Sequence, residues 1–327
     1  MRHYLIRRLM LVVPTLALIS IASFIVMQAP PGDFLTSYVA KLSSTGEAID
    51  RSTIEALRAR YGLDQPLYVQ YWKWISGFVV GDFGHSFEWN LPVRDLLGQR
   101  LLLTFAVSFT ALVLTWVVAL SIGVWSAVRQ YSLFDYVFTF IGFLGLATPN
   151  FMLALVLMYI SYAWFGHSAG GLFSPEFVDA PWTWAKFTDF LGHLWIPVIV
   201  IGTAGTASLI RIMRANLLDE LKQPYVETAL AKGLSFRRAL FKYPFRIAVN
   251  PFLSAIGWLL PSLIAGEIIV SIVLDLPTVG PLFLRALQNQ DMYLAGSVLM
   301  LIAILTVIGT LISDVVLAWV DPRVQYQ

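Results

Sequence analysis

Six long segments with little or no charge restrict this chain to one class of architecture. They cover residues 9–32, 101–128, 136–175, 190–210, 247–266 and 292–313. A helix needs roughly 20 residues to cross about 30 Å of hydrocarbon, so each segment is long enough for one membrane crossing. The third segment exceeds one crossing, and we expect its tail from about His167 to lie outside the bilayer.

The composition supports a membrane protein and narrows its type. Hydrophobic residues make up 58% of the sequence and charged residues only 13%. A transmembrane barrel would show alternating stretches of about 10 residues, which the sequence lacks. We therefore predict an all-α polytopic membrane protein with six transmembrane helices. The sequence has no cysteine, which excludes disulfides and thiolate chemistry but does not indicate a compartment.

The distribution of charge predicts the orientation of the chain. Arg2, Arg7 and Arg8 precede the first apolar segment, and an excess of Lys and Arg marks the cytoplasmic side. Two crossings then return residues 129–135 to the cytoplasm, four return residues 211–246, and all six return the C-terminal tail. We expect a multi-pass protein of the bacterial cytoplasmic membrane with both termini cytoplasmic, and we interpret the first segment as a retained helix rather than a signal peptide.

These features divide the chain into four predicted parts. Residues 1–32 form an N-terminal transmembrane helix, and residues 33–99 an extracytoplasmic segment with short interfacial helices. In that segment Ser52 and Glu55 match a capping box, and Gly62 can end the helix that follows. Residues 100–320 form a five-helix core, and residues 321–327 a cytoplasmic tail.

Residues 211–246 form a strongly basic loop within that core, with eight basic residues against three acidic ones. Pro224 suits the first turn of a helix and Gly233 its C-terminal stop. Ser235 can cap a second helix over residues 236–245. Between the proline and the glycine lies a short apolar face, made by Val226, Ala229 and Leu230. The pattern favours a folded knob offered to a soluble partner, while a plain solvated loop remains the alternative.

Sequence patterns for chemistry are few. The sequence lacks a phosphate-binding loop of the Gly-x-x-x-x-Gly-Lys-Ser/Thr type, and its four histidines lack metal-ligand spacing. Residues 166–170 read Gly-His-Ser-Ala-Gly, so an intramembrane serine protease of the rhomboid kind is a distant alternative, with Ser168 as nucleophile. Glu267 and Asp275 are candidate pathway or outer-gate acids, or they simply mark the end of the fifth segment.

Several motifs together resemble the permease subunits of ATP-binding-cassette importers, in the dipeptide and oligopeptide branch. They are Tyr-Leu-Ile-Arg-Arg-Leu at 4–9, Tyr-Gly-Leu-Asp-Gln-Pro-Leu at 61–67, Gly-Asp-Phe-Gly-His-Ser at 81–86 and Asp-Pro-Arg at 321–323. The match runs nearly end to end. It implies a type I importer core with an extra N-terminal helix and an outer segment after it.

The resemblance also assigns the basic loop. The family's signature is Glu-Ala-Ala, three residues, then Gly, and Glu227, Ala229 and Gly233 match it, while Thr228 replaces the first alanine. The resemblance implies that this loop is the coupling helix that docks on a cytoplasmic ATPase. The expected coupling site is Glu227, Thr228, Ala229, Lys232 and Gly233.

The same resemblance implies the partners and the limits of this chain. It predicts a second homologous permease, two ATPases that bind ATP and magnesium, an extracytoplasmic solute-binding protein and membrane lipid, with no nucleic acid. The chain itself is expected to hold no cofactor and no ATPase site. Residues 271–280 depart from the branch's usual pattern before the last span. Membership of this branch makes oligopeptides the expected cargo, and the departure at residues 271–280 leaves short oligosaccharides as the alternative.

Overall fold

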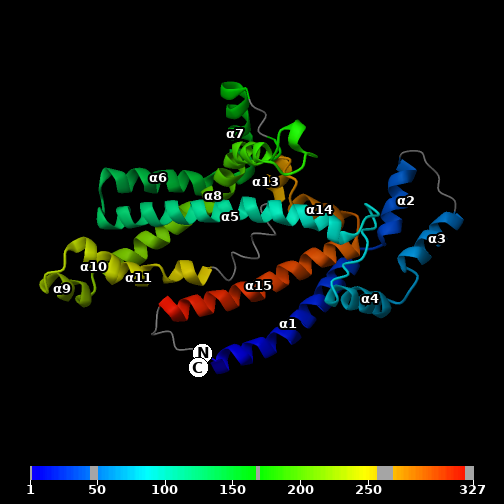
Figure 1. The fold of residues 1–327 in the computed structure, drawn as a ribbon, viewed down its shortest axis with the longest axis horizontal. Coiled ribbons are helices and arrows are strands. Elements are labelled where there is room, and N and C mark those ends of the chain that lie inside the picture. The colour runs from blue at the N-terminus through cyan, green and yellow to red at the C-terminus, as the bar shows by residue number, and fades with distance from the viewer. Residues whose placement is uncertain (1, 45–50, 167–169, 256–267, 321–327) are drawn as a thin grey trace. The chain divides into compact units, whose positions relative to one another are not determined.

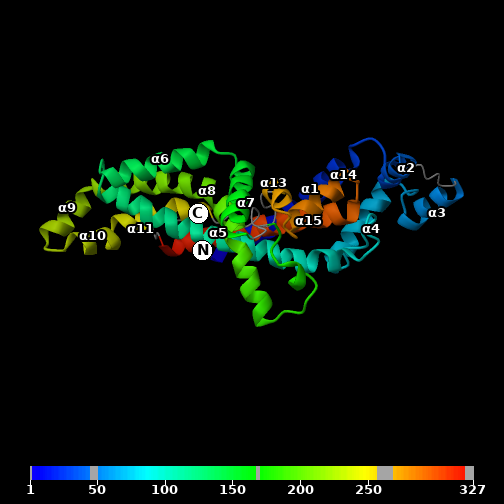
Figure 2. The same ribbon diagram turned by 90° about the horizontal axis from the view of Figure 1, so that it is seen from above.

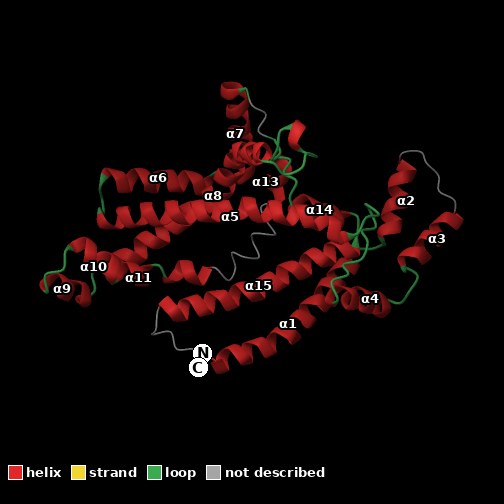
Figure 3. Cartoon of the chain, viewed as in Figure 1, coloured by secondary structure: helices red, strands yellow, loops and turns green. Residues whose placement is uncertain are grey.

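The computed structural model describes residues 2–44, 51–166, 170–255 and 268–320. Regular structure in these ranges is helical, as Figure 3 shows. The chain divides into two compact units. Unit 1 contains the described residues of 1–103 and 278–307, and unit 2 those of 104–277 and 308–327. Helices α5 (Val93–Val128) and α15 (Met292–Val320) contribute to both units.

Unit 1 combines the N-terminal helices with residues 278–307 from near the C-terminus (Figure 1). Its other helices are α1 (Arg2–Gln28), α2 (Phe34–Ser44), α3 (Arg51–Tyr61), α4 (Leu67–Val79) and α14 (Val279–Gln288). Helix α3 ends at Tyr61, directly before Gly62, which the sequence predicted as its stop and whose φ of 68° lies in the left-handed region.

Two contacts hold unit 1 together. Trp74 on α4 is 1% exposed and lies so close to Gly296 on α15 that a Cβ there would come within 2.7 Å of its ring. Asp291, before α15, is fully buried and accepts a hydrogen bond of 2.5 Å from the Ser86 hydroxyl. Burial raises the pKa of Asp291, and the hydrogen bond from Ser86 opposes that shift.

Unit 2 is built around α8 (Trp184–Leu221). The elements before it are α6 (Leu133–Ala147), α7 (Asn150–Phe165) and a 3₁₀ turn at Pro175–Phe177. The described helices of unit 2 that follow α8 are α9 (Pro224–Ala231), α10 (Phe236–Lys242), α11 (Pro244–Ala248) and α13 (Ile268–Val273). Figure 2 shows α6 and α8 side by side, in agreement with their atomic contacts.

The helices confirm a polytopic chain. Among the described residues, four helical segments are long and apolar enough to cross a membrane, and they are Met10–Gln28, Val93–Val128, Trp184–Thr203 and Met292–Val316. A fifth span results if α6 and α7 are counted as one bent span. The predicted fifth segment, 247–266, falls largely in the range 256–267, outside the described residues.

The predicted third segment, 136–175, is wrong as a single helix. Helices α6 and α7 are bent by 104° at a short break. At that break Thr148 is extended and Pro149 precedes the first residue of α7. Proline has no N–H for the helical ladder and disfavours helical angles at the residue before it, so the helix stops at this point.

Small residues let α6 and α8 run antiparallel at close range. A Cβ on Gly145 would lie 3.0 Å from the Thr203 side chain, and one on Gly142 would lie 3.8 Å from the Cβ of Ala207. Glycine at such positions allows helix backbones to approach closely, which favours packing within a bilayer. Helix α6 therefore follows α8 over most of its length.

Helix α5 also packs tightly on α8. A Cβ on Gly123 would come within 2.7 Å of the Met213 side chain, and the Thr115 hydroxyl donates a 3.3 Å hydrogen bond to the carbonyl of Gly202. Met213 belongs to a buried apolar cluster contributed by α5, α8, α10, α11 and one residue beyond α11. Its members are Ala119, Ala127, Ile210, Met213, Leu217, Leu240, Ala248 and Phe252. This cluster fixes the C-terminal half of α8 in unit 2.

Candidate functional site

Helix α8 continues well beyond the apolar segment predicted at 190–210. It runs without interruption to Leu221, so the first third of the predicted loop 211–246 is a helical stem. The stem is helical because apolar residues recur on one face, where Met213 and Leu217 are fully buried in the cluster. The turn that follows, residues 222–248, carries α9, α10 and α11.

Helix α9 begins and ends where the sequence predicted. Pro224 occupies its first turn, where the missing N–H costs nothing. Gly233 has a φ of 84°, and its N–H donates to Leu230 O at 2.9 Å. The N–H of Leu234 donates to Ala229 O at 3.2 Å. These two bonds form a Schellman motif, which satisfies carbonyls that the helix end would leave free.

The predicted coupling residues divide between two faces of α9. Ala229 is 6% exposed and packs inward with Val226, whereas Glu227, Thr228, Lys232 and Gly233 are exposed. Leu230, predicted on the apolar face, is 39% exposed and lies at its rim. The site thus presents one carboxylate, one hydroxyl and one ammonium group on a short helix whose other face is anchored.

The second helix of the turn is shorter than the predicted 236–245. Helix α10 ends at Lys242, and Pro244 begins α11. Tyr243 between them has φ −120° and ψ −80°, outside the helical region that a residue before a proline avoids. Ser235 stands at the N-cap position of α10, but the cap hydrogen bond expected from its side chain is not formed there.

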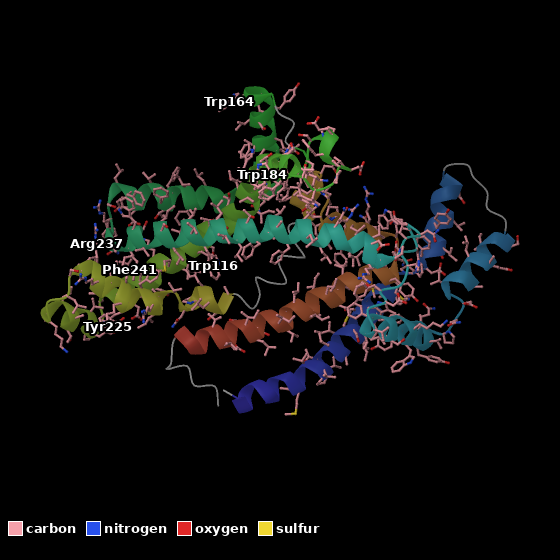
Figure 4. The ribbon with its side chains drawn as sticks, viewed as in Figure 1. Trp116, Trp164, Trp184, Tyr225, Arg237 and Phe241 are labelled. Atoms are coloured by element: carbon pink, nitrogen blue, oxygen red, sulfur yellow. The ribbon has the colours of Figure 1, made fainter. Side chains whose placement is uncertain are left out.

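Helix α10 is anchored on one side and exposed on the other. Ala239 and Leu240 are buried, and Leu240 belongs to the cluster around Met213. Arg237 and Phe241 are exposed, and Figure 4 shows both on the turn together with Tyr225. Arg238 and Lys242 are also exposed, so the turn offers a positive surface with aromatic side chains.

An ion pair that the sequence analysis missed lies at the base of this turn. Arg214 on α8 donates from Nε and one Nη to the two carboxylate oxygens of Asp135 on α6, each at 2.8 Å. The Asp135 side chain is 3% exposed and that of Arg214 is 26% exposed. Bidentate pairs of this kind are both strong and geometrically specific.

Asp135 also organises the turn between α5 and α6. Its carboxylate accepts a hydrogen bond of 3.0 Å from the N–H of Tyr131, while its own N–H donates to the Ser132 hydroxyl at 3.3 Å. Ser132 is therefore the side-chain N-cap of α6, and the Ser-x-x-Asp spacing at 132–135 could have indicated this cap. The partnership with Arg214, 79 residues away, had no local signal.

The electrostatics agree with this geometry. Hydrogen bonding to Asp135 raises the pKa of Arg214, an effect that partial burial opposes. Arg214 lies beyond the candidate span Trp184–Thr203, so its charge is outside that apolar window. The pair therefore joins two charged groups where two helices leave their apolar segments.

The remaining predicted residues lie elsewhere. Glu267 is outside the described residues, as is Ser168 of the Gly-His-Ser-Ala-Gly string. Asp275 is exposed after α13 with a φ of 51°, a conformation that Asp tolerates better than most residues. This placement agrees with the alternative that Asp275 marks the end of a helix, and its role in a pathway stays a prediction. Within the described residues, no group of three or more His, Cys, Asp or Glu could hold a metal ion.

Two family models together match most of the chain. Residues 119–326 match the family model described as binding-protein-dependent transport system inner membrane component, and residues 1–108 match the model of the corresponding N-terminal region. Together the two models include both α1 and the 222–248 turn.

Full-length relatives agree with the family models. The oligopeptide transport system permease protein AppB of Bacillus subtilis is 36% identical over 330 residues, covering 100% of both chains. The glutathione transport system permease protein GsiC of Escherichia coli K12 is 30% identical over 327 residues, and the oligopeptide transport system permease protein OppB of Haemophilus influenzae is 29% identical over 328, again with 100% coverage. The chain belongs to the family of inner-membrane components of binding-protein-dependent transport systems, and it is a permease subunit of such an importer.

Proposed function

We propose that this permease forms half of the membrane pathway of an ATP-driven importer and that α9 is its coupling helix. Glu227, Thr228, Lys232 and Gly233 contact a groove of the partner ATPase, and Ala229 seats α9 on its own subunit. When two ATPases close on ATP, they push on α9 and tilt the stem of α8. The pathway then changes its access from one side of the membrane to the other.

The observation that carries this proposal is the division of α9 into an anchored and a free face. Val226 and Ala229 are buried, while four of the five residues of the predicted site are exposed. The turn is mounted on a continuous helix whose C-terminal half lies in a close-packed cluster. A force on α9 is transmitted to α8 because close-packed interiors resist compression and pass strain onward.

The partners follow from the family and from the chemistry of the turn. A second permease completes the pathway, a solute-binding protein delivers cargo from outside, and membrane lipid surrounds the spans. The permease breaks and forms no covalent bonds, and ATP and magnesium bind to the ATPases. The basic turn and both termini lie in the cytoplasm, where Lys and Arg excess is expected.

Oligopeptides are the proposed cargo. Two of the relatives are named for oligopeptide transport and one for glutathione transport. Short oligosaccharides are the alternative that the sequence left open, because residues 271–280 depart from the pattern of the peptide branch.

Native mass spectrometry of the complex tests composition and cargo together. The complex is co-expressed with its neighbouring subunits and its binding protein, then released in mild detergent. We expect one copy of this chain, a second permease, two ATPases and a bound peptide mass. An oligosaccharide mass would overturn the peptide cargo, and a chain that emerges alone or as a homo-oligomer would overturn the coupling role.

Site-specific crosslinking tests the docking face. The chain has no cysteine, so a single introduced one carries the label without background. A photo-crosslinker on Thr228→Cys, in the exposed face of α9, should capture an ATPase. Arg58→Cys on α3, whose native side chain is 46% exposed, is the matched control and should not capture it. Equal capture from both positions would contradict the proposal.

A further inference from the structure

We infer that the Asp135–Arg214 ion pair is a positioning element that makes α6 move together with the coupling helix. The inference rests on the proposed function of α9 and assigns a task to two residues outside the predicted site. Its basis is geometric, since the pair joins the first turn of α6 to the stem from which α9 extends.

The first step concerns the position of the pair along α8. Arg214 lies between Met213, which is fully buried, and the end of α8 at Leu221. Seven residues at 1.5 Å rise place it about 10 Å from the end of the helix. Any displacement of α9 therefore reaches Arg214 before it reaches the apolar span.

The second step concerns how firmly Asp135 is held in α6. Its carboxylate is 3% exposed and also accepts the N–H of Tyr131, while its own N–H donates to Ser132. Both oxygens are fixed by Arg214 through a planar guanidinium, which cannot swivel without breaking one bond. A movement of Arg214 therefore pulls the capped end of α6 rather than a free side chain.

The third step concerns what lies at the other end of α6. The pairs Asp135–Arg214, Gly142–Ala207 and Gly145–Thr203 keep α6 against α8 along its length. Helix α6 ends at a 104° bend, and α7 begins beyond it at Asn150, directly after Pro149. A helix clamped at its start and packed along its face delivers the motion to that bend.

A neighbouring arginine provides the matched control. Arg211 lies one turn earlier on α8 and also faces α6, with its guanidinium carbon 5.4 Å from the Phe143 ring centroid. It is exposed, and its contact is a single cation–π approach rather than a bidentate pair. Arg211→Gln removes the same charge from the same helix and leaves the clamp intact.

The experiment uses the complete complex in nanodiscs, with spin labels on Val137→Cys in α6 and Ala231→Cys in α9, the latter outside the proposed coupling residues. Both native positions are exposed. The distance between the labels is measured by electron paramagnetic resonance without nucleotide and after trapping with ATP and vanadate. We expect the same distance in both states for the native pair and for Arg211→Gln. Asp135→Asn or Arg214→Gln should make the distance depend on the nucleotide state.

Coupling is measured on the same samples as the stimulation of ATP hydrolysis by the co-purified binding protein. Each single variant should lose about tenfold of that stimulation, and the double variant no more, because the two residues act as one unit. A native distance that changes on trapping would overturn the inference. So would single variants that lose thermal stability but keep both the fixed distance and the stimulation.

Gly233→Asp in the same complex separates the two hypotheses. If it leaves stimulation intact, the proposed function of α9 has failed and the pair has nothing to transmit. If Gly233→Asp abolishes stimulation while the pair variants keep it, only the inference about Asp135 and Arg214 is overturned.

Discussion

The two ends of α8 use the same residue types in opposite ways. At its N-terminal end, Lys186 is 5% exposed and donates to the carbonyls of Val178 and Ala180, at 3.2 and 2.6 Å. At its C-terminal end, Lys222 is exposed. The first lysine holds the chain's own loop, whereas the second belongs to a surface that remains open to another molecule.

The acidic residues repeat this contrast. Asp189 accepts hydrogen bonds from the N–H and the hydroxyl of Ser174, at 2.8 and 2.6 Å, and so ties the loop 170–183 to α8. Glu227, on α9, is exposed. Charges that are satisfied within the chain stabilise it, and charges left at the surface are available for recognition. The difference separates the charges that stabilise the loop 170–183 from those that remain exposed for a partner on the 222–248 turn.

The largest effect on stability should come from Lys186→Met. The change leaves two carbonyls without their charged donor and removes cation–π contacts of 4.8 and 5.4 Å to Phe173 and Trp182. Hydrogen bonds to charged groups contribute about 1.5–3 kcal/mol each, so we expect local opening of the loop to become easier by about 3 kcal/mol. Hydrogen exchange at residues 170–183 measures this. Lys222→Met is the control, and an equal effect there would erase the contrast.

A smaller loss should follow from Asp189→Asn. The amide keeps one acceptor oxygen for Ser174 but loses the charge that strengthens both bonds. We expect about 1.5 kcal/mol from the same hydrogen-exchange measurement. Asp219→Asn, at an exposed position on the stem, should stay within about 0.5 kcal/mol of the native protein. A larger change at Asp219 than at Asp189 would contradict this ranking.

Gly233→Ala should lower the stability of the protein by a smaller amount again, whereas its control should raise the stability. A Cβ at Gly233 meets nothing within 4 Å, so the cost is the strain of a φ of 84°, which is about 1 kcal/mol. Gly192→Ala near the other end of α8 has equal space and helical angles, and it should stabilise by about 0.5–1 kcal/mol. Thermal unfolding in detergent measures both, and a gain at Gly233 would refute the strain argument.

The smallest effect on stability should accompany the largest loss of function. Glu227→Lys places a positive charge in the first turn of α9, which costs about 0.5 kcal/mol through the helix dipole. We expect the ATPases to lose their attachment in pull-down, with thermal unfolding almost unchanged. Glu176→Lys, exposed in the 3₁₀ turn of the loop 170–183, should leave the ATPases bound. Loss of attachment in both variants would remove the distinction between the two ends.

Local patterns were enough to predict helix α9 of the site. Pro224 and Gly233 delimit α9 because a missing N–H and a positive φ are properties of single residues. The same reasoning could have divided the helix predicted at 236–245, since Pro244 lies inside it. It could also have divided the third segment at Pro149. In both places the apolar pattern continues across the proline, and the prediction followed the apolar pattern rather than the proline.

The sequence by itself determined that this chain crosses a membrane repeatedly, and it favoured a basic, folded turn. A hydrocarbon environment requires long charge-free helices, and such segments can be identified directly from the sequence. Only the tertiary structure decided which charges are free. Lys186 and Lys222 are indistinguishable as letters, and Asp135 meets Arg214 across 79 residues. Such pairing depends on close contact between helices, which is a property of packing rather than of local sequence.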